Sequence, residues 1–255
     1  MPAATFQKTF VLTVAESKRL IARALKRHPV IINALNRGIL AVAKGTTNSY
    51  FVEELLEEGI DRTDYCTGVT KPSKGADGAV TANKLPDLVL RDGERVEGVS
   101  ATEIAAEMGP GDVFVKGANA LNYERRQAGI LIGHPTGGTI GSVIGTIVSR
   151  RAVLMIPVGL EKNIPGDLHE IYRTMVRNGG EGGGPMLWPV DGEIFTEVEA
   201  LQLIMSGGSA APVAAGGIAG AEGSVRIAVW GSSDHVTRAE AAINGVLGEP
   251  PFIEP

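Results

Sequence analysis

The segment from Ile39 to Leu56 constrains the fold more than any other part of the chain. It opens with a short continuous apolar run that is typical of a strand buried on both faces of a parallel sheet. Lys44-Gly45-Thr46-Thr47-Asn48 breaks the run, and an amphipathic helical pattern follows from Ser49 to Glu58. The first backbone N–H groups of a helix have no intrahelical partner and therefore attract anions. The segment thus predicts an α/β protein that binds an anion at this turn.

Composition excludes several classes of protein. Among 255 residues, 24 basic and 29 acidic side chains give a formal net charge of -5, which leaves no basic surface for nucleic acid. Cys66 is the single cysteine and the four histidines are widely spaced, so we expect no metal site. The chain shows no secretory signal and no uninterrupted membrane span, which predicts a cytoplasmic protein without a membrane partner.

Further apolar runs extend the predicted sheet. Asp112 to Lys116 and Ala152 to Val158 are clear strands, Gly129 to Gly133 is another, and a helix is expected from Gly141 to Arg150. Strands that alternate with helices indicate parallel pairing through right-handed crossovers. We therefore expect a three-layer, Rossmann-like, mostly parallel sheet.

The glycine-rich run from Gly179 to Pro185 is typical of a hinge or a domain boundary. It divides the chain into a Rossmann-like domain, 1–178, and a small subdomain, 188–255. The β-α-β-β-α order of the second part predicts a ferredoxin-like α+β subdomain. The polar segment 59–86 is too long for an ordinary connection, and its role is left open. No Walker-type or dinucleotide-binding glycine pattern is present, so no cofactor is expected.

Three short motifs resemble one superfamily. Lys44 to Ser49 resembles a phosphate-binding turn after the first strand, Lys116-Gly117-Ala118-Asn119-Ala120 a strand-end segment, and Gly133 to Gly138 a glycine loop that opens a helix. Together they resemble the superfamily of ribose-5-phosphate isomerase, glucosamine-6-phosphate deaminase and coenzyme A transferase. The resemblance spans roughly Ile39 to Trp230 and implies the same fold, with a small subdomain near the C-terminus.

The chain departs from the family at the residues that carry isomerase chemistry. Isomerisation of an aldose phosphate needs a carboxylate base, which the family carries on the helix after the glycine loop. The corresponding helix here, Ser142 to Val148, has no carboxylate, and the acids of the strand-end segment are replaced by Lys116, Asn119 and Ala120. We therefore expect a member of the superfamily without pentose phosphate isomerase activity.

The candidate site gathers the residues that follow the predicted strands, because ligands of doubly wound sheets bind beyond the carboxyl ends of the strands. His134 and Glu161 are the candidate catalytic residues, and Lys162 could reach the same crevice. Each of these residues also has a purely structural interpretation. Lys44 and Lys116 could be solvated lysines, Asn119 could stabilise a turn, and His134 could bond only to the backbone. Glu161 and Lys162 could be exposed charges of a loop. The candidate ligand-binding residues are Lys44, Gly45, Thr46, Thr47, Asn48, Lys116, Asn119, Thr136, Gly137, Gly138 and Thr139.

Three functions follow from these residues. The first is binding of a small anionic metabolite, with a phosphorylated one expected, in a crevice at the carboxyl ends of the parallel strands. The second is a divergent isomerase or transferase acting on a sugar phosphate or an acyl thioester, with His134 or Glu161 as the base. The third is a non-catalytic, oligomeric structural protein that kept the fold. Whether the chain is an enzyme, and whether it forms a homo-oligomer, stays open.

Overall fold

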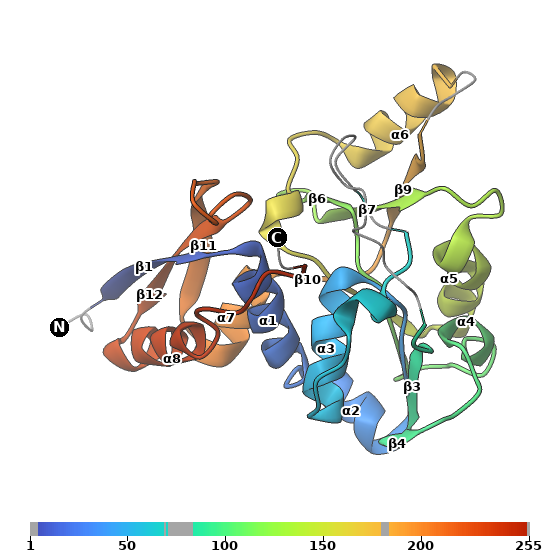
Figure 1. Ribbon diagram of the computed structural model, residues 1–255, viewed down its shortest axis with the longest axis horizontal. Coiled ribbons are helices and arrows are strands. Elements are labelled where there is room, and N and C mark those ends of the chain that lie inside the picture. The colour runs from blue at the N-terminus through green and yellow to red at the C-terminus, as the bar shows by residue number, and fades with distance from the viewer. Residues whose placement is uncertain (1–4, 69, 71–83, 180–183, 254–255) are drawn as a thin grey trace.

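The structure of the chain is a computed structural model that describes residues 5–68, 70, 84–179 and 184–253. In these residues the fold is mixed α/β, with three sheets and helices packed around them (Figure 1). Parts of the polar segment 59–86 and of the glycine-rich run lie outside the described residues.

The largest sheet has six strands and contains the predicted parallel strands. Its spatial order is β10-β8-β5-β2-β3-β4, and the first four strands are parallel to one another. The antiparallel hairpin at Asp92-Gly93 adds the last two strands to the edge. The bounds are β2 (Ile39–Val42), β3 (Leu88–Arg91), β4 (Glu94–Arg95), β5 (Val113–Val115), β8 (Val153–Pro157) and β10 (Glu193–Phe195). β2 and β5 are completely buried, as their continuous apolar runs predict.

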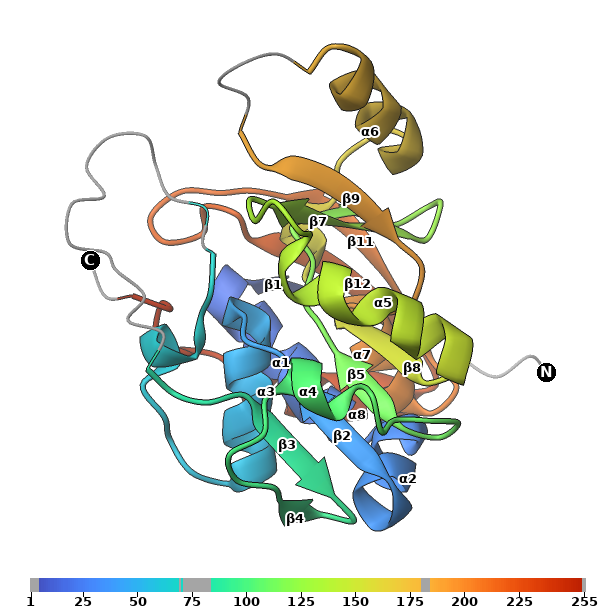
Figure 2. The ribbon, with the colours of Figure 1, turned by 90° about the vertical axis from the view of Figure 1, so that its right-hand side faces the viewer.

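Helices lie on both sides of this sheet, as the two perpendicular views show (Figures 1 and 2). α1 (Val14–Leu25), α2 (Pro29–Arg37) and α3 (Thr46–Leu56) lie on one side, and α4 (Ala101–Ile104) and α5 (Gly138–Arg150) on the other. The side chain of Thr13 accepts a hydrogen bond from the backbone N–H of Glu16, and the Glu16 carboxylate accepts one from the backbone N–H of Thr13, so a capping box begins α1. α3 begins at Thr46, three residues before the predicted start, so the anion turn is the first turn of the helix itself.

A second, three-stranded sheet corrects one prediction. The predicted strand at Gly129 to Gly133 exists as β7 (Gln127–Ile132), but it does not join the parallel sheet. It pairs antiparallel with β6 (Ala120–Asn122) and β9 (Met186–Val190), and α6 (Leu168–Arg177) packs against this sheet. A parallel neighbour requires a long crossover, whereas the few residues between β6 and β7 suffice only for a hairpin.

The third sheet joins distant parts of the chain. β1 (Phe6–Leu12) pairs antiparallel with β12 (Val225–Gly231), which pairs with β11 (Ser209–Ala215). α7 (Glu197–Met205) and α8 (Ser233–Asn244) pack beside these strands, and α1 lies between this unit and the large sheet (Figure 1). Strand pairing crosses the predicted boundary between 1–178 and 188–255, because β1 pairs with β12, β10 with β8 and β9 with β7.

Two short 3-10 helices complete the edge where the parallel strands end. η1 (Arg62–Tyr65) follows α3, and η2 (Leu160–Lys162) follows β8. The Tyr65 hydroxyl donates a hydrogen bond to the Val42 carbonyl at 2.5 Å and accepts one from the Leu88 backbone N–H at 2.8 Å, which fixes η1 against the sheet. Within the described part of the chain, no helix is both long enough and apolar enough to cross a membrane.

Candidate functional site

The carboxyl ends of the four parallel strands lie at one edge of the large sheet. The residues that follow these strands include Lys44 after β2, Lys116 after β5, Glu161 and Lys162 after β8, and Glu197 after β10. Helix α1 adds Lys18 from outside the sheet. We call the group formed by Lys18, Lys116, Glu161, Lys162 and Glu197 the strand-end cluster.

The turn after β2 is held by hydrogen bonds to both neighbouring strands. Asn48 is completely buried, and its Nδ2 donates to the Ala43 carbonyl at 2.7 Å and to the Val115 carbonyl at 3.3 Å. The Gly45 backbone N–H donates to the Tyr65 carbonyl at 3.0 Å. Asn48 thus has a structural role at the ends of β2 and β5, and one N–H group of the predicted anion turn is already occupied. The hydroxyl of Thr47 is buried without a hydrogen-bond partner among the described residues.

Two lysines of the cluster have no direct polar contact with the described protein around them. Lys18 is 7% exposed, and neither it nor the half-buried Lys116 forms a hydrogen bond or an ion pair with any described residue. Burial, together with the nearby charge of Lys162, lowers the pKa of Lys18 to about 8 and the pKa of Lys116 to about 8. The Lys162 Nζ donates to the Ala118 carbonyl at 2.8 Å. An anion placed among these groups would relieve their repulsion.

Two carboxyl groups lie beside the lysines. Glu197, the first residue of α7, is completely buried and accepts hydrogen bonds from the Leu160 backbone N–H, at 2.9 Å, and from the Ser17 side chain. Burial, and secondarily the negative charge of Glu161, raises the pKa of Glu197 to about 8, so it holds a proton at neutral pH. Glu161 is the second carboxyl group, and its charge acts on both Glu197 and Lys18.

The Glu161 side chain folds back over its own loop. One of its carboxylate oxygens, Oε2, is buried and has no hydrogen-bond partner among the described residues. A Cβ atom added at Gly159 would lie only 1.8 Å from this oxygen. Glycine at position 159 is therefore what allows the carboxylate to occupy this place.

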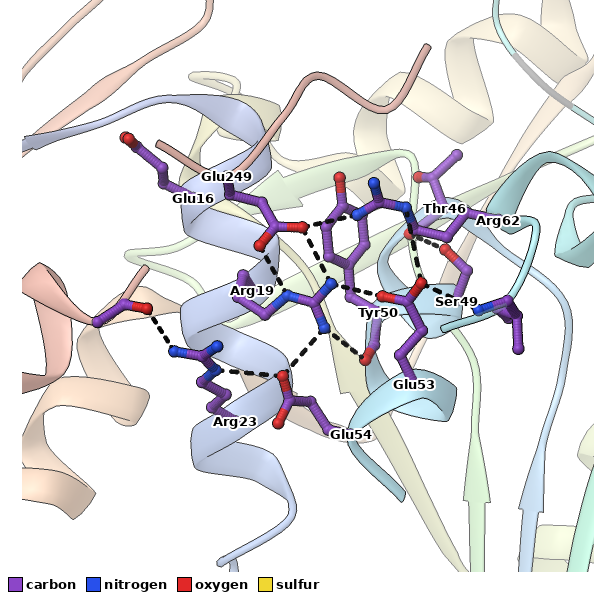
Figure 3. A network of polar contacts seen from close by, with 12 residues as sticks. Glu16, Arg19, Arg23, Thr46, Ser49, Tyr50, Glu53, Glu54, Arg62 and Glu249 are labelled. Atoms are coloured by element: carbon purple, nitrogen blue, oxygen red, sulfur yellow. Dashed lines mark hydrogen bonds and ion pairs between the residues drawn. The ribbon is translucent and has the colours of Figure 1, made fainter. Parts of the chain in front are cut away.

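The segment that ends the described chain covers one side of the cluster. Glu249 accepts hydrogen bonds from Arg19, at 2.9 and 3.0 Å, and from Arg62, at 2.7 Å (Figure 3). The two guanidinium groups lie over the Tyr50 ring, 4.8 and 4.3 Å from its centre. We call this group, with Glu53 and Glu54 of α3, the arginine clamp. Phe252 follows, and its ring centre lies 5.7 Å from the Lys18 Nζ.

The other candidate residues lie farther along the same side of the fold and make local contacts. The Asn119 side chain accepts a hydrogen bond from the Leu131 backbone N–H at 3.0 Å, which ties it to β7. His134 is exposed, and its Nδ1 lies 2.9 Å from the Thr136 hydroxyl. Thr136, Gly137, Gly138 and Thr139 form the entry to α5, where Gly137 adopts a positive φ of 88° and packs against Trp188. No hydrogen bond among the described residues connects His134 with the strand-end cluster.

Sequence reasoning missed two members of the cluster, Lys18 and Glu197. Lys18 had a detectable signal, because it falls on the apolar stripe of α1 with Val14, Ile21 and Leu25. A lysine on a buried helical face indicates either a covered stem or a binding group. Glu197 lies two residues after the end of β10, but a glutamate just after the cap residue Thr196 also suits the start of a helix, so its position gives no distinct signal of a site.

The described residues offer no group of three or more histidine, cysteine, aspartate or glutamate side chains placed to hold a metal ion. The groups that the strand-end cluster offers to a ligand are ammonium and carboxyl groups that are largely shielded from solvent. Compared with known proteins, the chain matches no protein-family model, no curated protein and no solved structure.

Proposed function

We propose that the chain binds a small anionic metabolite, phosphorylated or carboxylated, at the carboxyl ends of β2, β5 and β8. The observation that carries this proposal is the Lys18 ammonium group, which is buried and has no hydrogen bond or ion pair with any described residue. An unpaired buried charge costs free energy, so a fold that keeps one gains from a ligand that neutralises it.

Two further features support the same site. Lys116 and Lys162 lie close enough for their charges to act on each other, so an anion there would meet more than one ammonium group. The Thr47 hydroxyl at the start of α3 is buried and has no hydrogen-bond partner among the described residues, so this turn also keeps an unsatisfied donor. The helix dipole of α3 adds to the attraction.

The test is a thermal-shift titration with inorganic phosphate, sugar phosphates and dicarboxylates, on the unchanged protein and on Lys18→Met and Lys116→Met. A ligand at a hundredfold its dissociation constant stabilises by about 2.7 kcal/mol, which raises the Tm of a chain of this size by about 5 to 10 °C. We expect Lys18→Met to abolish this shift while raising the Tm without ligand, because methionine fills the space without an unpaired charge. A general loss of stability would lower both quantities instead.

Lys8→Met is the matched control, because Lys8 lies on the exposed strand β1 and pairs with Glu240. It should leave the ligand shift unchanged. Unchanged ligand binding in both Lys18→Met and Lys116→Met, or no shift with any anion, would contradict the proposal.

We also propose that the chain is a divergent, cytoplasmic relative of the isomerase, deaminase and transferase superfamily, without pentose phosphate isomerase activity. The parallel strands with helices on both sides support a Rossmann-like layout. β11, β12, α7 and α8 supply most of the predicted ferredoxin-like unit, with β1 in place of β10 as the third strand of its sheet.

A second candidate function is a divergent enzyme, and one observation favours Glu161 over His134 as its base. Glu161 lies beside the protonated Glu197 and near Lys18, whereas His134 lies in an exposed loop. Two neighbouring carboxyl groups of which one keeps its proton are suited to acid–base catalysis. Turnover of a bound sugar phosphate that is lost in Glu161→Gln and retained in His134→Ala would support this function. The third function, a non-catalytic oligomeric structural protein, would be favoured only if no anion binds.

A further inference from the structure

A cavity of about 390 Å³ adjoins the strand-end cluster on the side of the β11–β12 hairpin. It is lined by Tyr123, Glu124 and Asn163 near β6, by Glu161 of η2, and by hairpin residues that include Gly216 and Ser224. We call it the hairpin pocket. Its volume suits a small metabolite or part of one.

The charge of the hairpin pocket is opposite to that of the lysines. Its charged lining groups are the carboxylates of Glu124 and Glu161, and no lysine, arginine or histidine is among the described residues that line it. Lys162 follows Glu161 directly in the chain, but its ammonium group is held by the Ala118 carbonyl. The negative charge of Glu161 also acts on Lys18. Glu161 therefore stands between an acidic pocket and a basic cluster.

We propose that the ligand is a zwitterion: its anionic group lies at Lys18 and Lys116, and a primary amine extends into the hairpin pocket, where Glu161 binds it. This inference rests on the proposed function, because it assigns the ligand class of the same site. Glu161 lines the hairpin pocket and its charge also acts on Lys18, and such neighbouring charges of opposite sign favour a ligand whose charges have the reverse arrangement.

The arrangement of Glu161 agrees with this role. A carboxylate that served only to balance Lys18 would form an ion pair with it, yet no such pair is present among the described residues. Glu197 does not compete for the amine, because it is completely buried and its oxygens accept from Leu160 and Ser17. An ammonium ligand would supply the donors that Glu161 lacks.

The test uses pairs of compounds that differ only by the amine. Binding of aspartate is compared with that of succinate, and phosphoethanolamine with ethyl phosphate, by calorimetry at neutral pH. We expect the amine-bearing member to bind at least tenfold more tightly in at least one pair, and Glu161→Gln to bring that ratio close to one while inorganic phosphate still binds.

Two further variants separate the amine contact from a general disturbance. Glu58→Gln, at an exposed position after α3, should leave the ratio unchanged. Gly159→Ala keeps the charge of Glu161 but displaces its carboxylate, so it should reduce the ratio as Glu161→Gln does.

The outcomes distinguish this inference from the proposed function. If succinate and ethyl phosphate bind as tightly as their amine-bearing partners, or if the ratio survives in Glu161→Gln, the zwitterion is wrong and the anion site stands. If the amines do not bind although inorganic phosphate does, the result is the same. If no anion binds at all, including inorganic phosphate, both proposals fail.

Discussion

At the residue scale, the site depends on groups whose partners come from distant parts of the chain. Lys44, Asn48, Lys116 and Glu161 could be predicted as strand-end residues, because apolar runs locate the strands. The convergence of Lys18 on them could not be predicted, since it depends on how α1 packs across α3. Asn119 and His134 were expected in the site because of short sequence motifs. In the structure, Asn119 bonds to β7 and His134 bonds to Thr136 in its own loop.

Gly159 provides a prediction at this scale. Gly159→Ala should displace the Glu161 carboxylate while changing the free energy of unfolding by less than about 1 kcal/mol, because the atoms that an added Cβ would meet all lie at the end of that flexible side chain. The matched control is Gly45→Ala, where the atom nearest to an added Cβ, the Asn48 Cγ, is 4.0 Å away. Urea unfolding of both variants measures the difference. A loss well above about 1 kcal/mol for Gly159→Ala alone would show that the Glu161 carboxylate cannot move aside.

At the scale of elements, local signals predicted the strands β2, β5 and β8 and the helices α3 and α5, but not β6 or β9. Thr13, Ser100 and Thr196 each begin a helix with a capping box, and Asp92-Gly93 turns a hairpin. β1 was missed because it is an edge strand with mostly exposed residues, so its apolar and polar residues do not alternate clearly. β7 was predicted as a strand but assigned to the wrong sheet, since periodicity does not specify pairing partners.

The arginine clamp gives the prediction for this scale. Arg19 of α1 joins Glu53 and Glu54 of α3 to Glu249, and all three carboxylates are largely shielded from solvent. Arg19→Met should destabilise the fold by about 2 to 3 kcal/mol, because it removes charged hydrogen bonds to three shielded carboxylates, which then keep only Arg62 and Arg23 as ion-pair partners among the described residues. Arg23→Met is the control on the same helix, and it should cost under about 1 kcal/mol because the Arg23 side chain is 45% exposed. Chemical unfolding of both variants measures the two losses of stability. Equal losses for Arg19→Met and Arg23→Met would show that the arginine clamp does not stabilise the fold.

At the scale of the whole molecule, buried ionisable groups set how stability depends on pH. Glu197, whose ordinary pKa is 4.5, holds its proton to about pH 8 in the folded chain but loses it earlier in the unfolded chain. Stability therefore falls as the pH rises toward 8. Lys18 and Lys116 lose their protons near pH 8 in the folded chain but only near 10.5 in the unfolded chain, so stability rises again above pH 8.

We therefore expect a minimum of stability near pH 8, with changes on the order of 1 kcal/mol per pH unit on either side. Urea unfolding at pH 7, 8 and 9 measures it. Glu197→Gln should remove the fall, and Lys18→Met combined with Lys116→Met should remove the rise. Above pH 9 the buried thiol of Cys66, whose pKa burial raises to about 11, acts against the lysines, so the comparison ends there. A stability that changes monotonically over this range would contradict the assignment.

The pairing of β1 with β12 has a consequence for how the chain acquires its structure during synthesis. Leu12 lies opposite Val225, and Phe6 lies opposite Gly231. β1 therefore stays unpaired during synthesis until the ribosome has added more than two hundred further residues. α1 follows β1 directly but packs on α3 and α7, which both precede β12 in the chain, so the strand-end cluster does not depend on this pairing. Contacts between such distant residues fold slowly. A nascent chain stalled before Val225 should consequently expose β1 and β11 to chaperones, although the strand-end cluster can already form.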